Sequence, residues 1–331
     1  MSSSDRNQGA PVVVVTGPTV SGKSGLALAL ARAFDGEVIN ADSMQVYREL
    51  AILTARPGPE ALAQAPHRLY GVLSGSTPCS AGQWRDMALA AIEAARAAGR
   101  LPILVGGTGL YLRALKRGLA ALPPVPEAVR QAARARLAEQ GAAGLHAALA
   151  ARDPVMAARL RPSDSQRLVR AWEVLQATGR SLADWQGEGA EGRAPYRFRE
   201  IVLLPSRDAL YAACNARFEA MMAAGALAKV EALLALGLDP RLPVMKAVGV
   251  PELAALLRGE IGEAEAVARA QQATRRYAKR QMTWLRTQGA LAEGSQASKN
   301  NALVVANSQY SEQIEPEIFR FIRQEVLTLQ E

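Results

Sequence analysis

Short apolar runs rich in β-branched residues alternate along the chain with longer stretches of helical periodicity. The runs that we interpret as strands are residues 12–16, 37–40, 70–73, 101–105 and 201–204. Strands that alternate with helical segments in this way are typical of a parallel sheet joined by crossover helices. The pattern therefore predicts an α/β fold.

A long helical segment interrupts this alternation between the fourth and fifth predicted strands. It begins after a proline-rich breaker at residues 123–126 and ends in a stretch rich in Gly, Glu and Arg at residues 187–195. We interpret residues 123–195 as a helical insertion domain. Residues 11–122 are then the first part of the core, and residues 196–287 complete it and end in a basic helix.

The remaining residues, 288–331, form a tail to which we assign no role. Within it we expect a polar linker at residues 294–301. The apolar periodicity of residues 314–329 predicts a terminal amphipathic helix.

The residues that follow the first predicted strand match the phosphate-loop pattern G-x-x-x-x-G-K-[ST], and a helical pattern comes next. In this setting backbone N–H groups surround a phosphate, and the helix N-terminus adds partial positive charge. Lys23 brings a full positive charge, and Ser24 offers its hydroxyl to a magnesium ion. We predict that a di- or triphosphate binds to Gly17, Pro18, Thr19, Val20, Ser21, Gly22, Lys23 and Ser24.

Nucleotide-hydrolysing phosphate-loop proteins usually carry an acidic residue at the end of a second apolar strand. Here the strand at 101–105 runs into Gly-Gly-Thr-Gly, while the strand at 37–40 is followed closely by Asp42. Asp42 thus occupies the strand end where open α/β sheets bind ligands, as a base or a magnesium partner. Asp42 and Gln45 also have capping-box spacing, so the residues alone leave a helix-capping role open.

The chain is basic, with a net charge of +8 and a pI near 9.8. A nucleic-acid partner or a generally Arg-rich proteome would each explain this charge. The basic residues gather in two helical segments, residues 159–170 and residues 269–286. In the second, Tyr277 and Trp284 share a face, which fits either an RNA surface or a solvated helix with both rings in the core.

Cysteine and histidine usage gives no sign of a metal or disulfide framework. The chain has two cysteines and two histidines, with no C-x-x-C motif or Cys/His cluster. The N-terminal residues lack the apolar core of a signal peptide, and no apolar run approaches the length of a membrane span. We therefore expect a cytoplasmic protein that does not bind membranes.

Taken together, these motifs resemble the tRNA dimethylallyltransferases, which prenylate the adenine just 3′ of the anticodon. The matching segments are residues 17–24, 39–50, 104–115, 163–175, 216–225 and 274–286, in family order. The resemblance implies a P-loop NTPase-like parallel-sheet core that binds dimethylallyl diphosphate in place of a nucleotide. It also implies a helical insertion that grips the tRNA anticodon stem-loop, Mg²⁺ as cofactor, a monomer, and tRNAs that read codons starting with U.

The resemblance also assigns residue roles. Asp42 would be the base that accepts the proton of the adenine amine. Thr108 would lie beside the bridging oxygen or the ion, and Arg217 beside the diphosphate. Ser43, Met44 and Gln45 would line the adenine side with Asp42. The remaining tRNA contacts would come from Gln166, Arg167, Leu168, Val169, Arg170, Arg275, Lys279, Arg280 and Gln281.

The sequence departs from the family at three places. Ala213 stands where the family has an arginine, four residues before Arg217. Leu53 stands where glycine is usual, and residues 246–252 are a variant of the family's R-x-V-G-Y-R-[QE]. Three other functions share parts of the pattern: a P-loop small-molecule kinase, an isopentenyltransferase acting on free adenine nucleotides, and a non-catalytic RNA-binding protein. Metal-cluster prenyl synthases do not fit, since the chain has no D-D-x-x-D motif.

Overall fold

The computed structural model describes residues 9–189, 191–289, 291, 302–306 and 310–327. The chain divides into two compact units, each described separately below. The first unit comprises Met1–Lys116 and Ala194–Glu331, and the second comprises Arg117–Arg193. The second unit thus begins and ends a few residues earlier than the predicted insertion at 123–195.

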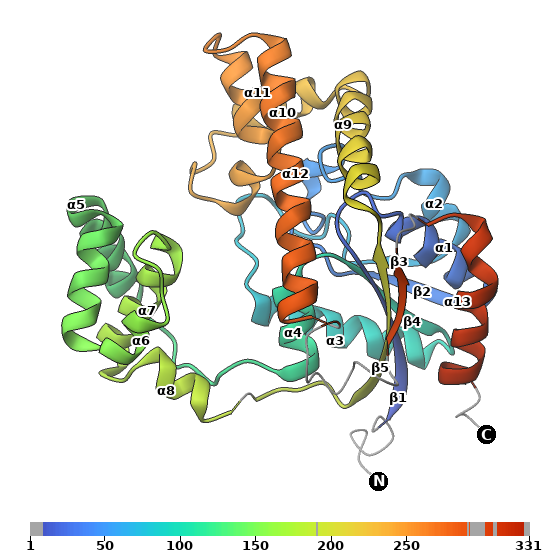
Figure 1. Ribbon diagram of the computed structural model, residues 1–331, viewed down its shortest axis with the longest axis horizontal. Coiled ribbons are helices and arrows are strands. Elements are labelled where there is room, and N and C mark those ends of the chain that lie inside the picture. The colour runs from blue at the N-terminus through green and yellow to red at the C-terminus, as the bar shows by residue number, and fades with distance from the viewer. Residues whose placement is uncertain (1–8, 190, 290, 292–301, 307–309, 328–331) are drawn as a thin grey trace. The chain divides into compact units, whose positions relative to one another are not determined.

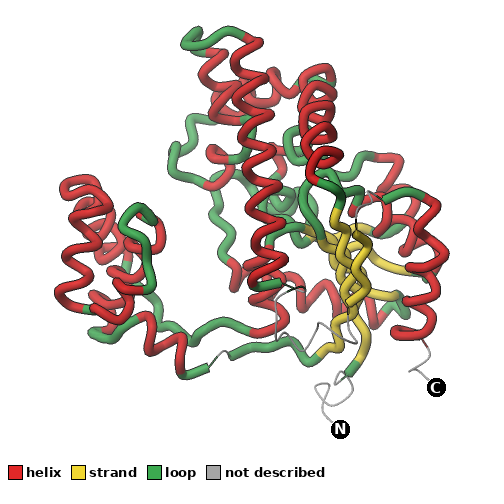
Figure 2. The backbone as a smooth tube through the Cα atoms, viewed as in Figure 1, coloured by secondary structure: helices red, strands yellow, loops and turns green. Residues whose placement is uncertain are grey.

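A six-stranded parallel sheet forms the centre of the first unit (Figures 1 and 2). Its strands follow the spatial order β3-β2-β4-β1-β5-β6, so β1 lies between β4 and β5. Every strand pair is parallel, which confirms the predicted α/β class. The strands are β1 Ala10–Thr16, β2 Gly36–Asn40, β3 His67–Arg68, β4 Leu101–Gly106, β5 Tyr196–Leu204 and β6 Ala302–Ala306.

β5 begins at Tyr196, five residues before the predicted strand at 201–204, and two other strands differ more from the prediction. The strand expected at 70–73 is wrong, because β3 lies earlier and Leu73 forms only an isolated bridge with Tyr47. Leu69 and Gly71 have positive φ angles of 64° and 60°, which turn the chain out of the extended conformation that a strand requires. β6 was not predicted, because it is a five-residue strand in a tail without motifs. The expected linker at 294–301 lies outside the described residues.

Helices cover both faces of the sheet. On one face α1 packs with α13 against Val13, Val15 and Ile103. On the other face α3, α4 and α9 to α12 contribute to a second core with Val12 and Val14, because successive residues of β1 point to opposite faces. The helices of this unit are α1 Lys23–Ala33, α2 Pro59–Gln64, α3 Ala81–Ala97, α4 Gly109–Arg117, α9 Arg207–Ala223, α10 Ala226–Ala235, α11 Val250–Leu257, α12 Glu263–Thr287 and α13 Glu315–Ile322.

A buried tryptophan anchors the carboxyl end of β2, two residues before Asp42. The Trp84 side chain is fully buried, and its indole N–H donates to the carbonyl of Asn40 at 2.9 Å. Its ring stacks on Tyr111 of α4, with centroids 4.6 Å apart. α3, which carries Trp84, begins with a capping box between Ser80 and Gln83. These contacts fix the strand end that leads into the candidate site.

The second unit is entirely helical in its regular structure. Its helices are α5 Glu127–Arg152, α6 Pro154–Ala158, α7 Ser165–Thr178 and α8 Leu182–Gly187. α5 is kinked at Gly141, whose φ is 68°. The core contains Trp172, and the guanidinium groups of Arg136 and Arg152 lie 4.5 and 5.5 Å from the centroid of its ring. No helix among the described residues of either unit is long and apolar enough to cross a membrane.

The tail is part of the first unit's core. Ile318, Ile322 and Val326 are fully buried in the same cluster as α1 and β1. Ahead of them, the backbone N–H of Tyr310 donates to the carbonyl of Ser21 at 3.1 Å. The tail therefore packs against the phosphate loop as well as the sheet. The predicted terminal helix at 314–329 corresponds to α13 and the π-helical turn Arg323–Leu327.

We expect Ile318→Ala to lower the free energy of unfolding by about 2–4 kcal/mol, because it leaves a cavity in a packed core. Val304→Ala is the matched control, since that side chain is in the tail but 40% exposed, and should cost less than about 1 kcal/mol. Urea unfolding followed by circular dichroism measures both. Equal stability of the Ile318 variant and the wild type would show that the tail does not belong to the core.

Candidate active site

A cavity of about 220 Å³ lies beyond the carboxyl ends of β1 and β2, between α9 and α12. This is the edge at which open α/β sheets bind ligands. One part of its lining is polar and charged, and the other is apolar. The polar part includes Thr19, Asp42, Ser43 and Arg217, and the apolar part includes Leu53, Phe218, Met221, Ala247 and Val248.

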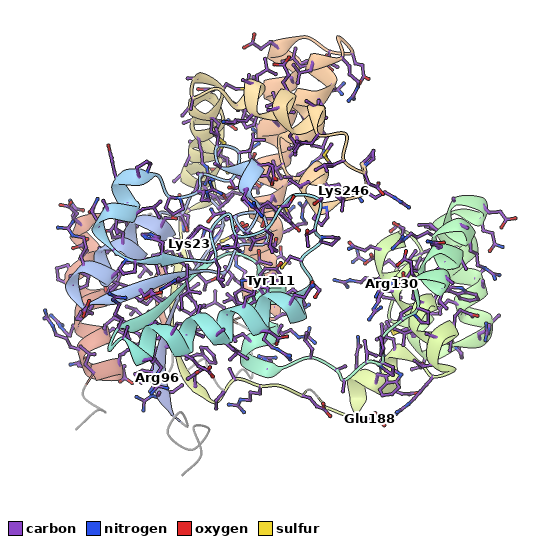
Figure 3. The ribbon with its side chains drawn as sticks, turned by 180° about the vertical axis from the view of Figure 1, so that it is seen from behind. Lys23, Arg96, Tyr111, Arg130, Glu188 and Lys246 are labelled. Carbon is purple, nitrogen blue, oxygen red and sulfur yellow. The ribbon has the colours of Figure 1, made fainter. Side chains whose placement is uncertain are left out.

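The phosphate loop forms the turn from β1 into α1. Gly22 immediately precedes the helix with a φ of 86°, a left-handed conformation that favours glycine. Lys23 begins α1 (Figure 3), and its Nζ donates to the carbonyl of Pro18 at 2.5 Å. The lysine ammonium is therefore folded over its own loop. Ser24 follows in the first turn of the helix and is exposed.

Lys23 loses part of its hydration in this position. Burial lowers its pKa to about 8, an effect that the charge of Asp42 opposes and the charge of Arg217 reinforces. Asp42 and Arg217 thus both act electrostatically on the lysine of the phosphate loop. The three residues come from segments far apart in the sequence, and the fold gathers them at one edge of the sheet.

Asp42 occupies a tight turn after β2. Its Oδ1 accepts the backbone N–H of Met44 at 2.9 Å, and its own N–H donates to Asn40 Oδ1 at 2.8 Å. The next regular element is the 3₁₀ turn Arg48–Leu50. The capping interpretation is therefore wrong, since no helix starts at Asp42. The hydrogen bonds instead hold its carboxylate at the cavity.

Thr108 joins the second glycine-rich turn to the Asp42 segment. Its Oγ1 accepts the backbone N–H of Ser43 at 2.9 Å. The backbone N–H of Thr108 also donates to the carbonyl of Ala41 at 3.3 Å. The Thr108 hydroxyl additionally donates to Ser43 Oγ at 3.3 Å. The structure thus places Thr108 against the residues on either side of Asp42 and shows that it fixes their backbone. The predicted contact of Thr108 with the bridging oxygen or the ion stays a prediction.

Arg217 extends from α9 to the phosphate loop. Its Nη1 donates to Thr19 Oγ1 and its Nη2 to the carbonyl of Thr54, each at 3.1 Å. Burial lowers the pKa of Arg217, and the charge of Asp42 acts in the opposite direction. Gln45 supports the same segment, because its Nε2 donates to the carbonyl of Thr54 at 2.8 Å. Arg217 is therefore a second, partly desolvated cation beside the loop.

The predicted RNA contacts on α12 have different environments. Lys279 and Arg280 are exposed, and Arg280 also lines the cavity. Arg275 is half-buried and donates to Asn215 Oδ1 of α9 at 2.5 Å. Gln281 is only 6% exposed and bonds to two backbone segments. The prediction that Gln281 contacts RNA is therefore corrected, because its amide faces the interior of the unit.

The predicted RNA contacts in the second unit lie on α7. Gln166 and Arg167 are exposed at its first turn, where Arg167 pairs with Asp164 at 3.4 Å. Arg170 is half-buried, and Val169 packs against the core. Leu168 is fully buried in that core. The prediction that Leu168 contacts RNA is corrected, because its side chain packs inside the core of the second unit.

The apolar wall of the cavity was not predicted from the sequence. Phe218 and Met221 extend from the same stripe of α9 as Cys214 and Arg217. The i, i+3, i+4, i+7 spacing of these four residues predicts that they share one face of the helix. It does not predict a cavity, because apolar residues at that spacing more often face a packed core. Leu53 lies in this wall, against Gly249.

The described residues contain no group of three His, Cys, Asp or Glu side chains that could hold a metal ion. A fully protein-bound metal site therefore has no support in this part of the chain. The Ser24 hydroxyl at the start of α1 still fits magnesium, which often takes one or two protein ligands together with phosphate oxygens and waters.

Comparisons with known proteins agree on one family. The IPP transferase family model matches residues 45–288. The tRNA dimethylallyltransferase of Rhodospirillum rubrum is 62% identical over 280 residues, which cover 84% of this chain and 86% of that relative. The tRNA dimethylallyltransferase of Rhodospirillum centenum is 58% identical over 85% of this chain and 90% of that relative.

Two solved structures extend the comparison to the fold. The tRNA isopentenylpyrophosphate transferase of Bacillus halodurans is 31% identical, has a TM-score of 0.67, and matches over 96% of this chain and 97% of its own. A eukaryotic dimethylallyltransferase acting on tRNA is 25% identical and has a TM-score of 0.77, over 95% of this chain and 78% of its own. Likeness on this scale covers both units of the chain.

The pKa of Lys23 leads to a prediction for anion binding. With a pKa of about 8 in the free protein, the ammonium is mostly charged near pH 7 and mostly neutral near pH 9. Because a bound diphosphate favours the charged form, its affinity should fall about tenfold over that range. Titration calorimetry with inorganic diphosphate measures this. In Lys23→Arg, which stays charged, the fall should be much smaller; equal slopes would contradict the assignment of Lys23 to the anion.

Proposed function

The chain belongs to the IPP transferase family, and we propose that its cavity transfers a dimethylallyl group from dimethylallyl diphosphate to the exocyclic amine of a tRNA adenine. It is an enzyme of tRNA isopentenylation. The adenine lies just 3′ of the anticodon, in tRNAs that read codons starting with U. The enzyme acts as a monomer in the cytoplasm, where its tRNA substrate is found.

One observation carries this proposal: the cation Arg217, the carboxylate of Asp42 and an apolar wall line one cavity, and a second cation, Lys23, is electrostatically coupled to both charged groups. Lys23 and Arg217 act electrostatically on each other and on Asp42, beside the phosphate loop. Phe218 and Met221 line the same cavity. A prenyl diphosphate has an anionic end and a hydrocarbon end, so it matches both parts of the lining. The carboxylate of Asp42 then remains free to act on the second substrate, the tRNA adenine.

The reaction needs a base and a stabilised leaving group. The adenine N6 attacks the allylic carbon, the bond from that carbon to the diphosphate oxygen breaks, and its electron pair leaves with the diphosphate. Asp42 accepts the proton that the amine loses. Lys23, Arg217 and the N–H groups of the phosphate loop stabilise the charge that develops on the leaving diphosphate. Thr108 holds the Asp42–Ser43 backbone in place for this transfer.

Magnesium is the cofactor that fits this site. The hydroxyl of Ser24 would be its protein ligand, with diphosphate oxygens and waters completing the shell. When bound, the ion supplies additional positive charge to the leaving diphosphate.

The RNA partner is supported by charge on both units. Exposed Lys279 and Arg280 on α12, and Gln166 and Arg167 on α7, offer donors for phosphates and base edges. We assign the anticodon stem-loop to these residues. The target adenine must leave its stack to reach Asp42, as bases do in other enzymes that modify them. Ser43 and Met44 line the cavity beside Asp42 and would contact that base.

A transfer assay tests the proposal directly. The purified protein is incubated with magnesium, labelled dimethylallyl diphosphate and unmodified tRNA with adenine 3′ of the anticodon. Label should appear in the RNA and disappear when that adenine is changed to guanine. Label transferred to free AMP in the absence of RNA would point to a nucleotide isopentenyltransferase. The absence of transfer, with tight ATP binding, would point to a kinase.

We expect Asp42→Asn to lower turnover by roughly 10²–10⁴-fold, because the amide cannot accept the proton from the amine. Its tRNA affinity should be nearly unchanged, since the side chain keeps its size. Initial rates at saturating substrates and a filter-binding assay measure the two effects. Asp35→Asn is the control, because Asp35 is exposed at the turn between α1 and β2. Wild-type turnover of the Asp42 variant would remove the base assignment.

We expect Arg280→Gln to weaken tRNA binding and to reduce the salt dependence of the binding constant by about one counterion. The physical reason is that an arginine bound to a phosphate displaces a cation from the RNA. Arg32→Gln is the control, because Arg32 is exposed on α1, which packs on the opposite face of the sheet. A salt slope identical to that of the wild type would take α12 out of the RNA interface.

A further inference from the structure

Gln281 of α12 lies at the junction of two loops that reach the candidate site from different strands. Its Oε1 accepts the backbone N–H of Thr19 in the phosphate loop at 2.7 Å. Its Nε2 donates to the carbonyl of Gly107 in the turn after β4 at 3.1 Å. The side chain is 6% exposed, so both bonds are shielded from water. One amide group therefore connects the two loops.

Each loop continues into one half of the reaction site. Thr19 accepts a hydrogen bond from Arg217, the cation on the diphosphate side. Gly107 precedes Thr108, which accepts the N–H of Ser43 beside the base Asp42. Gln281 is thus connected through Thr19 to Arg217 on the diphosphate side of the site. Through Gly107 it is connected to Thr108, on the side of the base Asp42.

The space around Gln281 is closed. A Cβ atom added to Gly107 would lie 2.2 Å from Gln281 Nε2 and 3.1 Å from the carbonyl oxygen of Gly17. Trp284, three residues further along α12, packs equally tightly against Gly109. A Cβ atom added to Gly109 would lie 2.2 Å from the Trp284 ring. The turn after β4 is therefore pressed against α12 and the phosphate loop. Loss of the amide bonds would let the turn and the loop move relative to each other.

The chemistry of the two contacts requires an amide. Thr19 offers a backbone donor and Gly107 a backbone acceptor, so the side chain between them must accept at one atom and donate at the other. Glutamate could accept but, when ionised, could not donate. Methionine has nearly the same length, cannot donate, and accepts only weakly through its thioether sulfur.

We propose that Gln281 is a positioning residue that sets the distance between the diphosphate and the base, and not the RNA contact that the sequence suggested. This role exists only if the chain transfers a prenyl group as proposed above. Displacement transfer is sensitive to alignment, and a shift of about 1 Å can cost roughly 100-fold in rate. Because Gln281 touches neither substrate, its loss affects the rate of transfer and leaves substrate binding almost intact.

The test compares Gln281→Met with Gln271→Met in the full-length protein. Gln271 lies on the same helix and also makes two hydrogen bonds, to Asn215 and Glu219 of α9, away from the two loops. Transfer to tRNA is measured under single-turnover conditions and normalised to the sites that bind inorganic diphosphate. We expect the transfer rate of Gln281→Met to fall about 10–100-fold. KM for both substrates should stay within about threefold, and the control should stay within about twofold of the wild type.

Two results would overturn this role. A normal transfer rate per diphosphate-binding site would reduce Gln281 to a packing residue. A raised KM for tRNA with a smaller salt slope and an unchanged rate would restore the RNA contact. If Gln281→Met does not fold, the transfer rate of Gln281→Glu tests the role instead, because glutamate keeps the acceptor and loses the donor. A wild-type transfer rate in that variant would also overturn the role. An inactive wild type would instead refute the proposed function.

Discussion

The site depends on an electrostatic constraint: two cations are held partly out of water beside a single carboxylate. Burial lowers the pKa of both Lys23 and Arg217, and the charge of Asp42 is the largest effect that opposes this lowering for each. Before substrate binds, one negative charge thus faces two positive charges that lack full hydration. In the proposed reaction a diphosphate would supply the missing negative charge, and its binding would offset a cost that folding has already incurred.

The fold meets this constraint with separate supports that converge at one edge of the sheet. β1 leads into the phosphate loop, β2 leads into Asp42, and β4 leads into Thr108. Trp84 holds the end of β2, and Gln281 joins the loops that follow β1 and β4. α9 and α12 close the cavity and contribute Arg217 and Tyr277. The tail packs against the outside of the phosphate loop through Tyr310.

Local sequence signals predicted the parts of this site that have a chemical pattern of their own. The phosphate loop and the strand ends near Asp42 and Thr108 were readable because motif and strand lie next to each other. Gln281 was misassigned because its neighbours Lys279 and Arg280 are basic, while its own partners are more than 170 residues away. β3 was misplaced because the positive φ of Leu69 is a tertiary effect: the Leu69 carbonyl accepts from Asn40. Helix periodicity alone could not show that Phe218 faces a cavity and Leu168 a core.

In the proposed reaction this phosphate loop serves cleavage of a carbon–oxygen bond and not of a phosphorus–oxygen bond. The phosphorus-containing product tests it most directly. We would quantify that product in reactions of the wild-type protein with dimethylallyl diphosphate, or ATP, in the presence and absence of tRNA. We expect one inorganic diphosphate for each prenyl group transferred to RNA, and no diphosphate without RNA. Release of inorganic phosphate from ATP, or diphosphate release that does not depend on RNA, would contradict it.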